Sequence, residues 1–255
     1  METQTGEKIT ATSTVCRWEF TVDTRMMDMN RVLRSDWLLG LNQQSGEHLF
    51  KCVGLGNEML EKQGIATVYT RIRLLFDRPV MVDEKLTLTT AMSFRRGPIM
   101  KRDLDLFDEN GEHAGGVYTE AVAMDVDTRS IMRGERCAVF DIVPCPENSR
   151  GALMPRFRLP QVMEEVGSFT IGYADIDFNG HMNNTKYINF VLGFADGGMK
   201  GHYLKEADME YHAECRGGET LTVRRGTDGD GQVITFSGTD GTERFRAKII
   251  LGDIE

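Results

Sequence analysis

The chain has 255 residues, of which 40% are hydrophobic and 27% are charged, and 30 Lys and Arg against 39 Asp and Glu give a formal net charge of −9. This composition is ordinary for a globular protein and excludes a mainly disordered, collagen-like or coiled-coil chain. The negative charge is spread over both halves of the chain, which excludes attraction of the whole surface to nucleic acid.

The first half of the chain predicts one strand, one helix and then four strands. The first strand is expected over 15–24, and apolar residues at helical spacing between Val32 and Leu41 predict the helix. The four strands that follow are predicted over 65–76, 85–94, 99–107 and 116–126. Asn110-Gly111 is typical of a hairpin turn between the last two of them.

A proline-rich segment separates the two halves. Four of the six prolines are Pro144, Pro146, Pro155 and Pro160. Because proline removes a backbone donor and restricts the residue before it, regular structure should lapse here. We therefore expect a linker over 137–165 between an N-terminal domain of residues 1–136 and a C-terminal domain of residues 166–255.

The second half repeats the plan of the first. It predicts a strand over 166–174, a helix that carries Tyr187, Ile188, Val191 and Leu192, and strands over 203–214, 220–225, 233–237 and 244–251. One helix followed by a run of antiparallel strands is an α+β arrangement in which the helix buries its apolar face against a curved sheet. This order is typical of the hotdog fold, so we predict a tandem (double) hotdog, with one long helix wrapped by an antiparallel sheet in each half.

Two blocks of sequence support an internal repeat. Asp28-Met29-Asn30 corresponds to Asp177-Phe178-Asn179 at an offset of 149 positions, and residues 74–89 resemble residues 209–224 at an offset of 135. The first half therefore carries 149 − 135 = 14 additional residues between the two blocks. Two matching blocks in the same order indicate two related copies of one unit.

The two copies differ in their titratable residues. His181 stands where the first copy has Val32, and Glu214 and Cys215 stand where it has Pro79 and Val80. One interpretation of these residues is structural: a polar turn with an Asn helix cap, a solvated strand end and a small buried thiol. A histidine and a carboxylate in only one of two related copies instead favour a site in the second half. Backbone N–H groups near 182–184, at the predicted helix start, could then stabilise an oxyanion.

The combined motif resembles that of a known family. Asp175 to Tyr187 read D-I-D-F-N-G-H-M-N-N-T-K-Y, and Glu210 to Cys215 read E-Y-H-A-E-C. This combination resembles the acyl-acyl carrier protein thioesterases of plants and bacteria, as do G-I-A-T-V-Y-T-R at 64–71 and Arg78-Pro79. The resemblance implies hydrolysis of fatty acyl-acyl carrier protein to free fatty acid, by a catalytic C-terminal half and an N-terminal half that shapes the acyl pocket. It implies catalytic positions at Asp177, Asn179, His181, Glu214 and Cys215.

Two mechanisms fit these residues. In the first, Asp177 or Glu214 activates water as a general base, and the water attacks the thioester. In the second, His181 activates Cys215 as a thiolate nucleophile. We favour water, because a thioester is already activated and because the adjacent Glu214 disfavours a thiolate.

Further expectations concern the substrate, the carrier and the location of the protein. Asn183 and Asn184 are expected near the substrate, and Trp37 and Leu41 in the acyl pocket. The carrier implied by the resemblance is acidic, so we expect it to dock on a basic hairpin, with a merely solvated hairpin as the alternative. The residues of that hairpin are Arg95, Arg96, Lys101 and Arg102.

The sequence also sets expectations about cofactors and surroundings. We expect no metal or other cofactor, no nucleic-acid or membrane partner, and a monomer or a homodimer. Five widely spaced cysteines without a C-x-x-C pair, and no apolar run of a membrane span or signal peptide, predict free thiols and a cytoplasmic protein. Alternatives on the same fold are an acyl-CoA thioesterase, a hotdog dehydratase and a non-catalytic acyl-binding protein.

Overall fold

The computed structural model describes residues 8–11, 15–143 and 156–254. The helices of the first half are α1 (Ser35–Cys52) and α2 (Asn57–Lys62), and its strands are β1 (Lys8–Ala11), β2 (Cys16–Thr21), β3 (Ile65–Phe76), β4 (Lys85–Arg96), β5 (Ile99–Phe107), β6 (His113–Asp125) and β7 (Ser130–Ile131). The second half has the helix α3 (Tyr187–Gly193) and the strands β8 (Glu164–Thr170), β9 (His202–Tyr211), β10 (Thr220–Asp228), β11 (Gly231–Ser237) and β12 (Glu243–Asp253).

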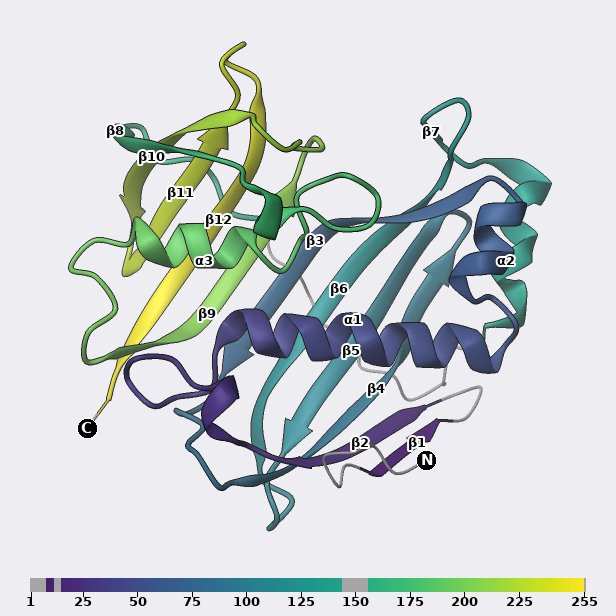
Figure 1. The fold of residues 1–255 in the computed structure, drawn as a ribbon, viewed down its shortest axis with the longest axis horizontal. Coiled ribbons are helices and arrows are strands. Elements are labelled where there is room, and N and C mark those ends of the chain that lie inside the picture. The colour runs from purple at the N-terminus through teal and green to yellow at the C-terminus, as the bar shows by residue number, and fades with distance from the viewer. Residues whose placement is uncertain (1–7, 12–14, 144–155, 255) are drawn as a thin grey trace.

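One antiparallel sheet runs through both halves. Its strand order is β1-β2-β4-β5-β6-β3-β9-β12-β11-β10-β8, so β2-β4-β5-β6-β3 and β8-β10-β11-β12-β9 repeat the same topology. Figure 1 shows α1 lying across the sheet of the first half and α3 across the sheet of the second, on the same face. The predicted α+β double hotdog is therefore confirmed.

The halves meet edge to edge through β3 and β9, in a register that preserves the repeat. Arg71 lies opposite Glu210, Arg73 opposite Asp208, and Leu75 opposite Glu206. At the offset of 135, Arg73 corresponds to Asp208, so this pair is its own equivalent. Exchanging the two halves converts the Arg71–Glu210 pair into the Leu75–Glu206 pair. A pseudo-twofold axis therefore passes through the Arg73–Asp208 pair.

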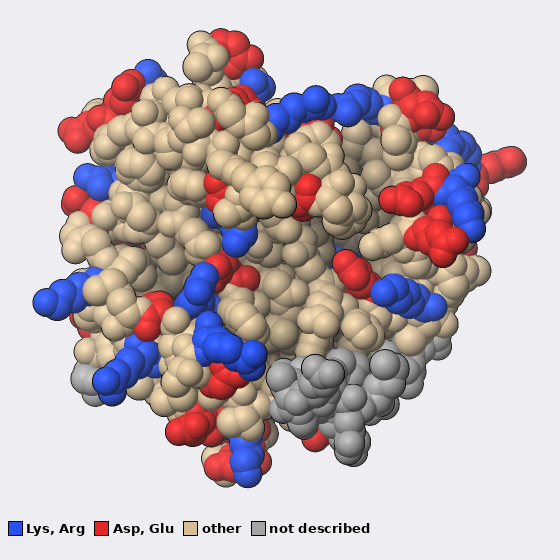
Figure 2. Space-filling view, viewed as in Figure 1, with Lys and Arg blue, Asp and Glu red and all other residues tan. Residues whose placement is uncertain are grey.

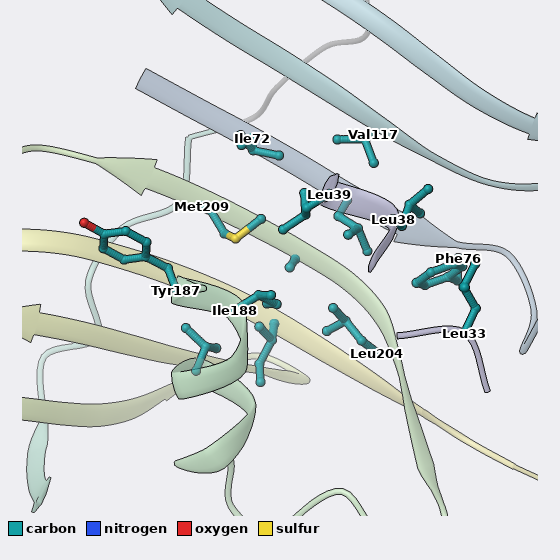
Figure 3. Packing of buried hydrophobic residues seen from close by; sticks show 14 of the residues in the cluster. Leu33, Leu38, Leu39, Ile72, Phe76, Val117, Tyr187, Ile188, Leu204 and Met209 are labelled. Carbon is teal, nitrogen blue, oxygen red and sulfur yellow. The ribbon is translucent and has the colours of Figure 1, made fainter. Parts of the chain in front are cut away.

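The main apolar core fills the space between the helices and the sheet. Leu38 and Leu39 of α1 and Ile188 of α3 point toward Ile72 and Met209, which lie on the central strands (Figure 3). These side chains come from both halves and are almost fully buried. Burial of apolar surface is the largest favourable contribution to folding, so this shared core holds the halves together.

The second helix is shorter than predicted. We expected a long helix in each half, but α3 has 7 residues against 18 in α1. Gly197 and Gly198, with φ of 74° and 70°, turn the chain away soon after α3 ends. The first half uses its additional residues for a longer α1 and for α2, which the sequence analysis did not predict.

The predicted linker agrees with the structure only in part. A 3-10 helix spans Gly134–Ile142 and buries Cys137 and Phe140, so regular structure extends past the expected start at 137. Pro144, Pro146 and Pro155 lie outside the described residues. β8 begins at Glu164, two residues before the predicted strand. The limits 1–136, 137–165 and 166–255 remain a proposal.

None of the helices in the described part of the chain is both long and apolar enough to cross a membrane.

One histidine of the first half links stability to pH. His113 Nδ1 lies 2.6 Å from Asp77 Oδ2, and His113 Nε2 lies 3.2 Å from Asp105 Oδ1. The hydrogen bond to Asp105, followed by that to Asp77, raises the pKa of His113 to about 9 against the opposing effect of burial. Because the pKa of His113 is raised on folding, its protonation stabilises the folded protein. This stabilisation is fully present at a pH below the unfolded-state pKa near 6.5, and it is lost as the pH rises through about 9.

We therefore expect His113→Gln to remove a pH-dependent part of the stability. Between pH 6 and pH 9.5 the wild type should lose ~1–2 kcal/mol more unfolding free energy than the variant, after allowance for solvent screening of this partly exposed group. Urea denaturation at the two pH values measures the difference. Equal losses in both proteins would contradict the assignment.

Candidate active site

The loop that carries His181 is folded around the carboxylate of Asp177. Asp177 Oδ1 accepts hydrogen bonds from the backbone N–H groups of Asn179, at 2.8 Å, and His181, at 3.4 Å. The Asp177 N–H in turn donates to the carbonyl of His181, and Gly180 has a φ of 79°. Short Asp side chains favour such local turns, and glycine fits the left-handed position.

The first half contains the same loop with Val32 in place of His181. Asp28 Oδ1 accepts from the N–H groups of Asn30, at 2.8 Å, and Val32, at 3.2 Å, and Arg31 has a φ of 61°. The aspartate is therefore a folding element of the loop in both copies. This geometry supports a positioning role for Asp177.

Each loop is fixed to the same place in its own half. The Met182 N–H donates to the Cys215 carbonyl, and the Leu33 N–H donates to the Val80 carbonyl. Likewise His181 pairs with Arg216, as Val32 pairs with Met81. These contacts confirm the sequence match of Glu214 and Cys215 to Pro79 and Val80.

His181 and Glu214 form the polar pair of the site. His181 Nε2 lies 3.1 Å from Glu214 Oε2, and the side chains are 22% and 43% exposed. The same Oε2 lies 3.0 Å from Arg129 Nη1 and 4.0 Å from Arg216 Nη2. Glu214 is thus a water-accessible carboxylate held by an imidazole and two guanidinium groups.

The pair Asn30 and Asn179 shows how the two copies diverge. Asn30 Nδ2 donates to the carbonyls of Met199 and His202, and Asn30 Oδ1 accepts from the Gly201 N–H at 3.0 Å. The first-half amide is thus fully used in binding the second half. Asn179 is exposed, and the hydrogen bonds of the described residues include none from its side-chain amide. The side-chain amide of Asn179 in the second copy is therefore available to a ligand.

Cys215 lies next to the site but is enclosed. Its side chain is 0% exposed, and its Sγ lies 3.9 Å from the Ala213 carbonyl. Burial raises the pKa of the Cys215 thiol, although a hydrogen bond with Tyr187 acts in the other direction. A buried thiol with a raised pKa has little thiolate character, so it is a weak nucleophile.

Asn183 and Asn184 have structural partners. Asn183 Oδ1 accepts from the backbone N–H and the hydroxyl of Thr185, both at 2.9 Å. Asn184 Oδ1 accepts from Gln43 Nε2 of α1 at 2.8 Å, and its carbonyl accepts from the Tyr211 hydroxyl at 3.1 Å. Asn184 therefore joins the loop that carries His181 to the helix of the other half.

Two of the three backbone N–H groups expected to stabilise an oxyanion, near 182–184, already have acceptors. The N–H groups of Met182 and Asn183 already donate to the carbonyls of Cys215 and Asp175. The helix α3 begins only at Tyr187 and has 7 residues. The oxyanion site near 182–184 therefore stays a prediction, and the exposed side-chain amide of Asn179 is a second candidate donor.

The expected pocket residues lie in the apolar interior. Leu41 is 8% exposed and belongs to the main core, and Trp37 is partly buried and packs against it. Their direct contact with an acyl chain remains a proposal.

The basic hairpin differs from the expected docking patch. Arg102 is 5% exposed and its guanidinium bonds inside the first half, so its assignment to carrier docking is wrong. Side chains alternate along β5, which places Lys101 outward, where it pairs with Glu120, and Arg102 inward. Arg95 forms an ion pair with Asp141, and Arg96 is exposed.

Sequence reasoning missed two residues of the site, Arg129 and Gln43. Arg129 follows β6, has a φ of 51° and reaches Glu214 from the other half. No local pattern marks a contact between residues 85 positions apart.

Figure 2 shows Lys and Arg side chains gathered along the edge between the C-terminal half and the end of β7.

Comparison with known proteins agrees with this arrangement of fold and site. Residues 13–136 match the acyl-ACP thioesterase N-terminal domain, and residues 161–248 match the acyl-ACP thioesterase C-terminal domain. The fold and the paired domains define a double-hotdog protein with an N-terminal and a C-terminal acyl-ACP thioesterase domain. The chain belongs to the acyl-ACP thioesterase family.

Two curated plant relatives match part of the chain. The palmitoyl-acyl carrier protein thioesterase of Arabidopsis thaliana is 26% identical over 173 residues, which cover 60% of this chain and 39% of the relative. The dodecanoyl-[acyl-carrier-protein] hydrolase of Cinnamomum camphora is 29% identical over 129 residues, which cover 40% and 33%. The chain thus spans about two fifths of the length of the first of these relatives.

Solved structures share the fold over nearly the whole chain. The acyl-ACP thioesterase of Bacteroides thetaiotaomicron has a TM-score of 0.82 at 19% identity, over 93% of this chain and 98% of that one. The 12:0-ACP thioesterase of Umbellularia californica has a TM-score of 0.81 at 19% identity, over 94% and 98%.

Proposed function

We propose that this protein hydrolyses the thioester of fatty acyl-acyl carrier protein, releasing free fatty acid and the carrier with its thiol restored. The observation that carries this proposal is the asymmetry of the two loops. The same loop occurs twice, but only the second copy joins an imidazole to a carboxylate beside an exposed amide. Family membership and the names of the plant relatives support acyl carrier protein as the handle on the acyl chain.

Glu214 is the proposed general base. It removes a proton from water, and the water oxygen attacks the thioester carbonyl carbon. The carbonyl oxygen becomes an oxyanion, which the Asn179 amide stabilises by a hydrogen bond. When the tetrahedral intermediate collapses, the C–S bond breaks and the proton on Glu214 passes to the leaving thiolate.

Three residues support this step without taking the proton. His181 orients Glu214 through the 3.1 Å contact, and Arg129 holds the same carboxylate oxygen from the other half. Asp177 shapes the loop through two backbone N–H groups. Asp28 makes the same bonds in the copy that lacks the His–Glu pair, so Glu214 is the better candidate for the base of the two carboxylates.

Cys215→Ala is expected to retain activity within about threefold, because the thiol is buried and water is the nucleophile in this mechanism. Steady-state hydrolysis of an acyl-carrier substrate measures the effect, with thermal melting as a check on the fold. A covalent acyl group trapped on Cys215, or a burst of product release, would contradict the water mechanism.

The carrier is expected to dock on exposed basic groups, because acyl carrier protein is acidic. Arg96 at the hairpin remains a candidate, whereas Arg95 is already paired with Asp141. We further propose that the protein acts in the cytoplasm as a monomer or homodimer, in fatty acid biosynthesis. The thiols of Cys16, Cys52, Cys137 and Cys215 are free, which suits a reducing compartment.

The deciding experiment compares acyl-carrier substrates from C4 to C18 with their acyl-CoA counterparts, following free thiol and free fatty acid. Much higher kcat/KM for the carrier-bound substrates would support the proposal. Equal or better cleavage of the CoA esters would make the protein an acyl-CoA thioesterase. Binding of acyl ligands without cleavage would favour a non-catalytic acyl-binding protein.

A further inference from the structure

A buried guanidinium divides the interior of the first half. Arg102 projects from β5 toward α1 and is 5% exposed. Its Nη2 donates to the Asn42 carbonyl at 2.8 Å and to the Tyr69 hydroxyl at 3.3 Å, and its Nη1 donates to Thr90 Oγ1 at 2.9 Å. Within 8–11, 15–143 and 156–254, no carboxylate forms an ion pair with Arg102.

The helix above Arg102 is adapted to this side chain. A Cβ added at Gly46 would lie 2.9 Å from Arg102 Cζ and Nη2, so the guanidinium packs directly on the helix backbone. Glycine inside a helix costs about 1 kcal/mol relative to alanine. The helix therefore gives up stability at a position where any side chain would displace the guanidinium.

The residues around Arg102 form a polar layer inside an otherwise apolar half. Asn42, Ser45 and Gly46 occupy consecutive turns on the buried face of α1, between Leu38 and Leu49. The apolar residues fall into two separate clusters, one with Leu38 and one with Leu49. An isolated buried charge is costly, and such conflicts with stability concentrate where function requires them.

The polar layer is connected to the candidate site through α1. Gln43, the neighbour of Asn42 in α1, donates to Asn184 in the loop that carries His181 at 2.8 Å. Tyr211 also contacts Asn184, through its hydroxyl. One turn of α1 therefore contacts the loop of the candidate site through Gln43 and the Arg102 guanidinium through the Asn42 carbonyl.

We propose that Arg102 is a specificity-determining residue that closes the far end of the acyl pocket and selects short and medium acyl chains. The inference rests on the proposed function, because it concerns the acyl group of that reaction. Methylene groups gain free energy by leaving water for an apolar environment, and they gain none by displacing the hydrogen-bond partners of a buried charge. A longer chain would have to break the bonds of Arg102 to Asn42 and Thr90 in order to reach the second cluster.

The test replaces Arg102 by methionine, which is unbranched, apolar and flexible. Lys101→Met is the matched control, because it removes one positive charge from the adjacent position of β5, where the side chain points outward. Arg102→Gln is a milder variant in case Arg102→Met does not fold, which circular dichroism and thermal melting will establish. Each protein is titrated with saturated fatty acids from C6 to C18, and hydrolysis of the matching acyl-carrier substrates is measured.

We expect wild-type binding and kcat/KM to fall steeply above a limiting chain length. Arg102→Met should move that limit upward by at least two carbons and strengthen binding of the longest acids about tenfold, and Lys101→Met should leave it unchanged. A folded Arg102 variant with the wild-type length profile would overturn the proposal. Tighter wild-type binding of ω-carboxy acids than of plain acids of equal length would also overturn it, because Arg102 would then be an anion site.

The two readouts separate this inference from the proposed function. Length-limited fatty acid binding that Arg102→Met relaxes, without any hydrolysis of carrier substrates, would reject the hydrolase and retain the role of Arg102. Hydrolysis with a length profile that both Arg102 variants leave unchanged would retain the hydrolase and reject this role.

Discussion

Glu214→Gln is expected to lower kcat by about 10³-fold and to change KM little, because a general base contributes roughly 10²–10⁴-fold. Glutamine keeps the size of the side chain and an oxygen that can accept from His181 and Arg129. It cannot take a proton from water. The loss should therefore appear in the chemical step and leave substrate binding intact.

The matched control is Glu219→Gln, a carboxylate of the same β9–β10 connection, immediately before β10. Glu219 pairs with Arg244 at 3.0 Å and is half-buried, and the proposed mechanism does not use it. Its variant should keep activity within about threefold, as expected for a residue outside the reaction. Comparable kcat values for Glu214→Gln and the wild type would reject Glu214 as the base.

The second large effect is expected at Asp177, where two substitutions separate positioning from proton transfer. Asp177→Ala removes the acceptor of the Asn179 and His181 N–H groups, and we expect a loss of about 10²-fold in kcat/KM from the displaced loop. Asp177→Asn keeps an oxygen at Oδ1 and should stay within about tenfold of the wild type, because neutral hydrogen bonds remain possible. A general base at Asp177 would instead make the two variants equally inactive.

The repeat supplies a control for this prediction within the same chain. Asp28→Ala removes the same two hydrogen bonds from the first-half loop, so its unfolding free energy should fall by a similar amount, about 1–3 kcal/mol. Its kcat/KM should remain close to that of the wild type, because no His–Glu pair depends on that loop. Kinetics and urea denaturation of both variants measure the contrast, and equal loss of activity would show that the loops are not independent.

Most strands could be predicted from the sequence because their side chains alternate between core and surface. The predicted strand over 65–76 matches β3, and that over 99–107 matches β5. Along β5, Met100, Arg102 and Leu104 share one side. This alternation indicates that Arg102 points inward. Its charge instead led to its assignment to the basic hairpin expected to bind the carrier.

The helices and the site were less accessible to sequence reasoning. Val32 and Leu33 fit a helical spacing, but they precede α1 because the loop around Asp28 continues to them. His181 and Glu214 were each found by comparing the two copies, since a residue gained in one copy only is visible in the sequence, but the 3.1 Å contact between them was not predicted. The contacts of Arg129 and Gln43 depend on how the halves pack, which no local pattern encodes.

The pairing of β3 with β9 within one chain determines how specific activity depends on enzyme concentration. Because both halves belong to one chain, their association is intramolecular and occurs at a fixed effective concentration. Dilution therefore cannot separate Arg129 from the Glu214 that it contacts, and specific activity should stay constant at enzyme concentrations far below those at which two separate subunits would dissociate. The described residues contain one His181–Glu214 pair, so under the proposed function we expect each chain to turn over one carrier at a time.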